Sequence, residues 1–171
     1  RILTSGTALY YFSNLSTYED SALAFADFRV ISGGSLTTTR VGFEVQAFLG
    51  SSTMIDVAVR ADTTGFRIAY VGGATLVTVA ADMTEFMQFM LCVESGRRLE
   101  IYYKRPYEAA WTSAVQTSSP ATQSGSAAGM WWGHVQASNS VSEWRGVWYA
   151  PSTSTPSSLA SSWLTTESRT P

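Results

Sequence analysis

Alternation of apolar and polar residues with a period of two runs through most of this chain, and it constrains the fold more than any other feature. The clearest run places Val41, Phe43 and Val45 on one face and Glu44 and Gln46 on the other. Successive side chains of a β-strand point to opposite faces, so such a run predicts a half-buried strand. The same alternation recurs at 55–60, 66–71 and 98–104.

Short segments of Gly, Ser, Asp, Thr and Glu separate these runs, at 33–35, 50–52, 62–65, 72–73 and 94–96. Such residues suit tight turns, so neighbouring runs are predicted to pair as antiparallel hairpins. Roughly ten strands at a spacing of about 8–12 residues, with no long helical period between them, favour a sandwich or barrel over βαβ units. We therefore predict an all-β fold, a two-sheet antiparallel β-sandwich.

Two segments interrupt the alternation. The stretch 118–129 is small and polar, which predicts a long exposed loop. Near the end, 151–156 has the composition of a Ser/Thr/Pro linker, and 156–164 is predicted to form a short C-terminal helical turn that packs Leu159, Trp163 and Leu164 on the core. We expect residues 1–171 to be a single domain, and a fragment of a longer chain.

Composition narrows the choice of partners. Only 14% of residues are charged and the net charge is −2, without a basic cluster, so neither nucleic acid nor an anionic membrane is an expected partner. No apolar run reaches the roughly 18 residues of a membrane helix, so membrane insertion is not expected. Cys92, the one cysteine, lies in an apolar run and is predicted to be a small buried side chain.

The second half of the chain resembles a known group of folds. Residues 87–103 form a strand, a small turn and a second strand, and Met130-Trp131-Trp132-Gly133 and Trp144-Arg145-Gly146 follow as aromatic strands with glycine. This order is similar to the laminin-G/pentraxin branch of the concanavalin A-like lectin/glucanase folds, over roughly 43–164. The resemblance implies a jelly-roll sandwich and carbohydrate recognition. The connection at 105–111 is longer than the family's short Asp-Gly turn.

The sequence offers little catalytic chemistry. Glycosidases of this fold carry paired carboxylates on one strand in a Glu-x-Asp-x-x-Glu pattern, which is absent here. His134, the one histidine, is expected to make a structural hydrogen bond or to lie at a rim. No metal is predicted; calcium, which many relatives bind, is the ion we weighed, with Asp56, Asp62 and Asp82 as the candidate ligands.

Aromatic residues gather in the last third of the chain and are the candidate binding residues. Neighbours on a strand face opposite ways, so at most one of Trp131 and Trp132 is core, and Trp148 and Tyr149 divide likewise. Outward rings either stack on sugars or pack against protein. The candidate site comprises Tyr107, Trp111, Trp131, Trp132, His134, Trp144 and Trp148.

These observations leave three hypotheses. The first is a non-catalytic carbohydrate-binding or adhesion module whose partner is a cell-surface glycan. The second is a virion structural or decoration domain that contacts neighbouring subunits, and the third, least supported, is a glycan-cleaving enzyme. The composition, rich in Ala, Ser, Thr and Gly, resembles accessory domains of bacteriophage tail proteins. We therefore expect an oligomeric assembly on an extracellular surface or a virion.

Overall fold

The protein is described here by a computed structural model, which covers residues 2–5, 9–12, 21–37, 40–48, 52–94, 98–125, 129–135 and 140–152. Within these ranges the regular elements are β-strands. In chain order they are β1 (Ile2–Ser5), β2 (Leu9–Phe12), β3 (Ser21–Ser32), β4 (Arg40–Phe48), β5 (Thr53–Asp62), β6 (Gly65–Tyr70), β7 (Thr75–Ala80), β8 (Met87–Glu94), β9 (Arg98–Lys104), β10 (Thr112–Thr117), β11 (Gln123–Ser124), β12 (Gly129–Val135) and β13 (Val141–Ser152).

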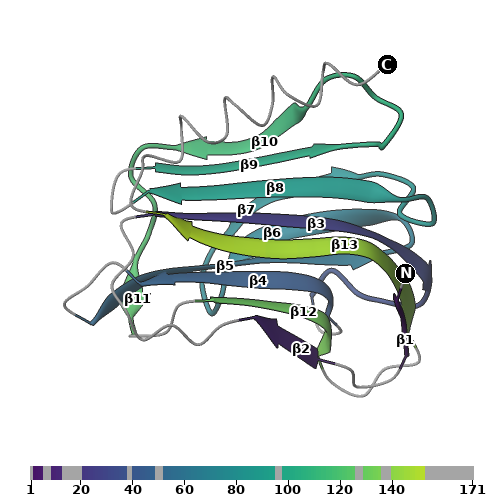
Figure 1. The fold of residues 1–171 in the computed structure, drawn as a ribbon, viewed down its shortest axis with the longest axis horizontal. Helices are drawn as coiled ribbons and strands as arrows, with labels where there is room; N and C mark the ends of the chain where they lie inside the picture. The colour runs from purple at the N-terminus through teal and green to yellow at the C-terminus, as the bar shows by residue number, and fades with distance from the viewer. Residues whose placement is uncertain are drawn as a thin grey trace.

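The strands form two antiparallel sheets that lie face to face (Figure 1). The described strands of sheet A follow the order β1-β13-β3-β8-β9-β10. Those of sheet B follow β2-β12-β4-β5-β6-β7, and β11 pairs with β5 beside this path. The predicted all-β two-sheet antiparallel sandwich is therefore confirmed.

Hairpins predicted from the turn residues account for much of this topology. β4, β5, β6 and β7 pair in sequence within sheet B, and β8, β9 and β10 do so within sheet A. The turn between β5 and β6 shows how a side chain can hold such a hairpin. The Asp62 carboxylate accepts hydrogen bonds from the backbone N–H and the hydroxyl of Thr64, at 2.7 and 2.8 Å, which fixes the turn.

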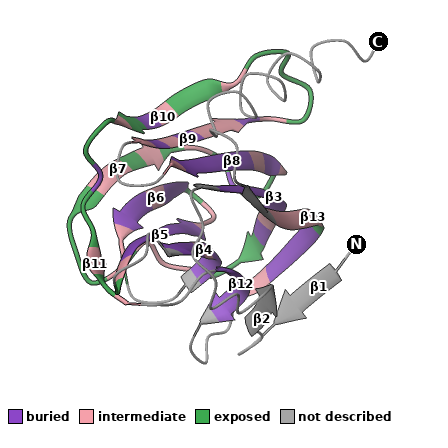
Figure 2. Cartoon of the chain, turned by 60° about the vertical axis from the view of Figure 1, so that its left-hand side comes forward, coloured by how far each residue is buried: buried purple, intermediate pink, exposed green. Residues whose placement is uncertain are grey.

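The core lies between the sheets and follows the period-two pattern. Val41, Phe43 and Val45 face inward on β4, as predicted. At the centre Phe28 stacks on Trp144 with ring centroids 4.4 Å apart and on Phe89 at 5.5 Å. Aromatic side chains bury large apolar areas, so this stack supplies a major part of the stabilising contact. Figure 2 shows the buried colour concentrated on the central strands of both sheets.

The expectation of one long loop at 118–129 is wrong in part. Gln123 and Ser124 form β11 and pair with Met54 and Thr53 of β5, and Pro120 is buried. Backbone hydrogen bonding by these small polar residues depends on an available strand edge, which local composition does not reveal. The predicted C-terminal helical turn at 156–164 lies outside the described residues.

Candidate ligand-binding site

The outer face of sheet B carries a row of polar side chains at one end. Inward positions of β4 and β5 are apolar, so alternation places Glu44 and Gln46 of β4 and Asp56 of β5 on the outer face. Gln46 and Asp56 are directly opposite in the strand register. Trp131 of β12 is opposite Glu44 and shares this face.

The Asp56 carboxylate is the centre of this row. Asp56 is only 4% exposed, and its Oδ2 accepts hydrogen bonds from Gln46 Nε2 at 2.9 Å and Gln123 Nε2 at 2.8 Å. Gln123 reaches this position because β11 pairs with β5. Hydrogen bonds from two amides offset the cost of burying a carboxylate and fix its orientation.

A hollow of about 310 Å³ opens beside this carboxylate. Asp56, residues 70–74 and residues 121–123 line it. The Tyr70 hydroxyl oxygen accepts a hydrogen bond from the Ala121 N–H at 3.0 Å, which ties the two walls together. Gly72 lies in the lining turn with φ of 72°, and no atom stands within 4 Å of the place where a Cβ would be. Small residues in this turn therefore keep the hollow open.

Gln46 links the two carboxylates of this row. Gln46 Nε2 also approaches Glu44 Oε1, at 3.4 Å, so its amide group lies between two carboxylates. Gln46 Oε1 is buried and has no hydrogen-bond partner in the described part of the chain. A buried carbonyl oxygen without a donor costs about 1–3 kcal/mol, so Gln46 Oε1 is a position at which a ligand N–H or O–H would be favourable.

The opposite end of the same face is basic. Arg60 of β5 and Arg67 of β6 are directly opposite in register, and Arg67 Nη1 donates to the Leu36 carbonyl oxygen at 3.3 Å. Asp56 and Arg60 are four positions apart on one strand, so their Cα atoms are about 13 Å apart. Glu44 is opposite Ala58 and therefore lies between the levels of Asp56 and Arg60 on this face.

Three residues of the predicted site lie in the core. Trp132 and Trp144 are 5% and 1% exposed with ring centroids 5.0 Å apart, and His134 is fully buried. The Ser142 hydroxyl lies 2.7 Å from His134 Nε2 and accepts a hydrogen bond from Trp144 Nε1 at 2.9 Å. Of the two placements expected for His134, a structural hydrogen bond or a position at a rim, the structure has the buried hydrogen bond. Because these three side chains fill the space between the sheets, we leave them out of the candidate site.

Trp111 and Trp148 come together on the outer face of sheet A. Both pack on a small cluster of Leu23, Met90 and Cys92. Trp148 stacks on Phe25 at 6.0 Å, and the Lys104 ammonium lies 5.0 Å from the Trp111 ring centroid. Tyr149 packs against the core, so the predicted division of Trp148 and Tyr149 between two faces is confirmed. These two tryptophan rings contact protein.

Tyr107 lies in the β9–β10 connection and is 77% exposed. Its hydroxyl donates to Glu85 Oε2 at 3.5 Å, and it lines no part of the hollow. Trp131 is half-buried and is the predicted aromatic that shares a face with the Asp56 row.

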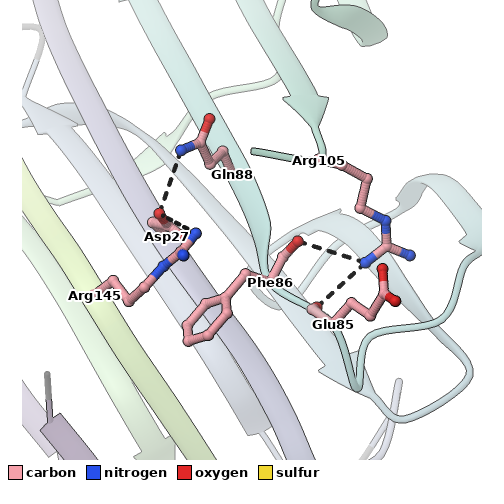
Figure 3. Close-up of polar contacts among 6 residues, drawn as sticks. All are labelled: Asp27, Glu85, Phe86, Gln88, Arg105 and Arg145. Carbon is pink, nitrogen blue, oxygen red and sulfur yellow. Dashed lines mark hydrogen bonds and ion pairs between the residues drawn. The ribbon is translucent and has the colours of Figure 1, made fainter. Parts of the chain in front are cut away.

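Charged groups on the outer face of sheet A pair with one another (Figure 3). Arg145, at a bulge in β13, donates to Asp27 Oδ2 at 3.0 Å, and its guanidinium lies 3.8 Å from the Phe86 ring centroid. Gln88 Nε2 also donates to Asp27, at 3.3 Å, and Arg105 Nη1 donates to the Glu85 and Phe86 carbonyl oxygens. The N–H groups of Gln88, Arg105 and Arg145 therefore donate hydrogen bonds within the protein.

The described residues contain no group of three or more His, Cys, Asp or Glu side chains that could hold a metal ion. Of the three aspartates weighed as calcium ligands, Asp62 and Asp82 fix turns instead. Hydrogen bonds from the Thr84 hydroxyl and N–H hold the pKa of the Asp82 carboxyl below its usual value. Asp56 is bonded to two amides, as described above.

Sequence reasoning missed most of the hollow. Gln46, Tyr70 and Gln123 were not singled out, and Asp56 was weighed only as a calcium ligand. Gln46 and Asp56 are ten residues apart and Asp56 and Gln123 are 67 residues apart, so only the pairing of β4, β5 and β11 brings them together. The signal available in the sequence was the presence of polar residues at outward positions of two alternating strands.

No family model and no curated protein matches this sequence. Solved structures match its fold. An arabinofuranosidase in complex with arabinofuranosyl-α-1,2-xylobiose aligns with a TM-score of 0.58 at 10% identity, over 98% of this chain and 40% of that chain. The alginate lyase AlgAT5, of polysaccharide lyase family 7, aligns with a TM-score of 0.52 at 10% identity, over 85% of this chain and 63% of that chain.

The described residues therefore form a concanavalin-like jelly-roll sandwich, the fold of these carbohydrate-active proteins. The chain spans about three fifths of the lyase and two fifths of the arabinofuranosidase. No helix in the described part of the chain is long and apolar enough to cross a membrane.

Proposed function

We propose that this domain binds a carbohydrate in the hollow beside Asp56. The observation that carries the proposal is the hollow itself, which joins a buried carboxylate, a glutamine amide and a tyrosine at the end of sheet B. Sugar sites combine an apolar surface with a few oriented polar groups that select hydroxyl positions. The volume of about 310 Å³ lies at the lower end of the range for small-molecule sites.

The structural relatives support this reading at the level of the fold. One is an arabinofuranosidase with a bound arabinofuranosyl-xylobiose and another is an alginate lyase, so the sandwich is a framework on which proteins recognise glycans. We also assign the chain to the laminin-G/pentraxin branch of this fold, on the β8–β9 hairpin and the bulged strand at Trp144–Arg145–Gly146.

We propose that binding occurs without cleavage. Two carboxylates do approach the same amide, since Gln46 Nε2 lies 3.4 Å from Glu44 Oε1 and 2.9 Å from Asp56 Oδ2. This arrangement is what keeps glycan cleavage as the second candidate, because glycosidases use two carboxyl groups. Asp56 is nevertheless almost fully buried and hydrogen-bonded to two amides, which suits positioning of a sugar better than attack on one.

The setting we propose is a bacteriophage tail or fibre protein, or another virion surface protein, in which this domain is one part of an oligomeric assembly that contacts a host glycan. Composition supports this proposal: the chain is rich in small polar residues and only 14% of its residues are charged. In the alternative, a virion structural domain, the Trp111 and Trp148 side of sheet A would contact a neighbouring subunit.

An Ala74→Trp variant tests the glycan proposal. Ala74 is exposed and lines the hollow, so an indole ring there would fill the space without entering the core. We expect calorimetric titration to show at least a tenfold loss of affinity for any oligosaccharide selected on a glycan array. The matched control is Ala109→Trp, at an exposed position of the β9–β10 connection outside the hollow, which should bind as the wild type does.

Two results would count against the proposal. An array without a single bound glycan would remove carbohydrate binding, and unchanged affinity in Ala74→Trp would move the site elsewhere. Release of shortened products from a bound oligosaccharide, abolished by Glu44→Gln, would establish cleavage in place of binding alone.

A further inference from the structure

We infer that two copies of this chain pair through the β7 edge of sheet B, in an antiparallel arrangement centred on Thr78. The inference concerns the partner of one strand edge, and it does not depend on carbohydrate binding. It gives the oligomeric assembly proposed above a contact between identical subunits. It follows from the strand order, from the direction of the backbone groups of β7 and from the sequence of that strand.

β7 lies at the end of sheet B with one side open. It pairs with β6 and is the last described strand in the order β2-β12-β4-β5-β6-β7. Thr75, Thr78 and Ala80 are exposed and the other three residues of the strand are half-buried, as the colours of Figure 2 show. An edge strand of this kind is a template on which a further strand can pair.

The backbone geometry shows which residues of β7 would bind that further strand. The Ala81 N–H donates to the Thr64 carbonyl oxygen at 3.0 Å, on the β6 side. The register with β6 is continuous from Val77 to Ala80, and in an antiparallel pair the backbone groups alternate in direction from one residue to the next. Thr78 and Ala80 therefore direct their N–H and C=O groups away from β6, where no described strand pairs with them.

β7 lacks the features that usually protect a sheet edge. Lysine, proline and bulges are the common protection, and the sequence of β7 contains no charged residue and no proline. Its one shift in register with β6 lies at Leu76, before the regular part of the strand. In β10, the neighbouring edge strand of sheet A, a shift between Ser113 and Val115 instead interrupts the middle of the strand.

The sequence of β7 is complementary to a second copy of itself. Val77-Thr78-Val79 reads the same in both directions. A two-fold axis at Thr78 places this residue opposite Thr78 of the second copy, and Val77 opposite Val79 of the second copy. The threonine pair can exchange hydrogen bonds on the outer face. Val77 and Val79 pack against the core, so their pairs would continue the apolar inner face across the contact.

The paired copies would carry two hollows on one side. Residues 70–74, which line the hollow, lead directly into β7. A two-fold axis perpendicular to sheet B keeps the outer faces of both copies, each with its Asp56, on the same side. If the hollow binds a glycan, as proposed, the dimer would bind a surface of repeated glycans more tightly than a monomer does.

Disulfide formation tests the register. In Thr78→Cys the two introduced thiols face each other, with Cα atoms about 5.5 Å apart, which a disulfide can span. We expect mild oxidation to give a covalent dimer on a non-reducing gel. The matched control is Ala80→Cys, also exposed, whose Cα atoms would be about 13 Å apart, so it should stay monomeric. Cys92 is 2% exposed and should not contribute.

Charge variants test the contact without a covalent bond. Two short strands bury less than the roughly 1,200 Å² of a standard interface, so sedimentation should show a dimer that depends on concentration. Thr78→Lys and Thr78→Glu each place like charges on the axis and should raise the dissociation constant about tenfold or more. A mixture of the two variants should dimerise again, because opposite charges then meet.

Ser124→Lys is the matched control for added charge. Ser124 is exposed and lies on β11, away from the β7 edge, so this variant should dimerise as the wild type does. A chain that stays monomeric up to about 1 mM would overturn the inference. So would a dimer that neither charge variant weakens, a mixture that does not dimerise, or equal disulfide formation by both cysteine variants. Each of these results would leave glycan binding in the hollow intact.

Discussion

The outer faces of the two sheets differ in how they use their charged and aromatic side chains. On sheet A, Arg145 pairs with Asp27, Arg29 pairs with Glu143, and Trp148 stacks on Phe25. On sheet B, Asp56 lines a hollow of about 310 Å³, and Gln46 donates a hydrogen bond to Asp56 from the neighbouring strand. The charged side chains named on sheet A pair with one another, whereas on sheet B a buried carboxylate lines a space that can hold a ligand.

This difference shows that a charged residue on a sheet face indicates a ligand site only where space accompanies it. The cluster of Arg105, Arg145 and Phe86 in Figure 3 contains two guanidinium groups, yet both make internal contacts. We therefore expect substitutions on sheet A to change stability, and substitutions beside the hollow to change binding.

The largest expected effect comes from Gly42→Ala in sheet B. Gly42 has φ of 150°, and a Cβ there would overlap the carbonyl oxygen of Val59 on β5. The two strands would have to separate, so we expect a loss of at least about 3 kcal/mol in the free energy of unfolding, together with loss of glycan binding.

Denaturation with urea measures this loss. The matched control is Gly72→Ala, because Gly72 also has positive φ but has open space around the Cβ position. That variant should lose only about 1 kcal/mol. Similar losses in the two variants would show that the close approach of β4 and β5 is not what requires glycine at position 42.

A smaller effect is expected from Arg29→Ala in sheet A. Arg29 donates from Nε and Nη2 to Glu143 Oε2, at 2.9 and 2.8 Å, and Glu143 is 1% exposed. Removal of one partner of a buried ion pair costs about 3–5 kcal/mol, and since a third of the Arg29 side chain is exposed we expect about 2 kcal/mol. Binding in the hollow should not change.

Urea denaturation and glycan titration of the same variant check both statements. Arg98→Ala serves as the control, because its pair with Glu100 spans 3.5 Å and Arg98 is 44% exposed. An exposed pair of this kind contributes less than about 1 kcal/mol. A drop in glycan affinity on Arg29→Ala would contradict the separation of roles between the two faces.

The smallest expected effect is the change that Cys92 causes in the free energy of unfolding at alkaline pH. Burial, with the nearby Glu100 charge, raises the pKa of the Cys92 thiol from 9.0 to about 12. Below pH 9 the thiol is neutral in the folded and unfolded chains and the full stability is present. Between about pH 9 and 12 only the unfolded chain ionises, so stability falls as pH rises, by about 1.4 kcal/mol per unit.

Urea denaturation at pH 8 and at pH 10 measures this dependence. Wild-type protein should lose about 1.4 kcal/mol more than Cys92→Ala between these two values. Thiol reagents should also leave the folded protein unmodified at pH 8, because Cys92 is 2% exposed. Equal losses in both proteins, or rapid labelling, would show that the outer face of sheet A is open at Cys92.

The pattern of the sequence was sufficient for the sandwich and for much of its core. Period-two alternation predicted the inward faces of β4, β5 and β9, and the turn residues predicted the hairpins. Side-chain direction in a strand follows directly from backbone geometry, so it can be read from local sequence. The division of Trp131 from Trp132 was predictable for the same reason.

The candidate site was not predictable in this way. Large aromatic residues were selected because exposed tryptophan needs a partner, yet Trp132 and Trp144 fill the core and Trp111 and Trp148 pack on sheet A. The hollow depends instead on Gln123 reaching Asp56 through the pairing of β11 with β5. A two-residue strand has no periodic pattern, so its place was decided only when the rest of the sheet offered an edge.

The sequence by itself determined that this chain forms a two-sheet sandwich, because alternation and turn chemistry are local properties. The tertiary structure alone decided where the hollow beside Asp56 lies. Strand order and register bring together residues as distant as Asp56 and Gln123, and they let Arg29 and Glu143 neutralise each other on sheet A. Such pairing depends on contacts between distant segments, which no local pattern encodes.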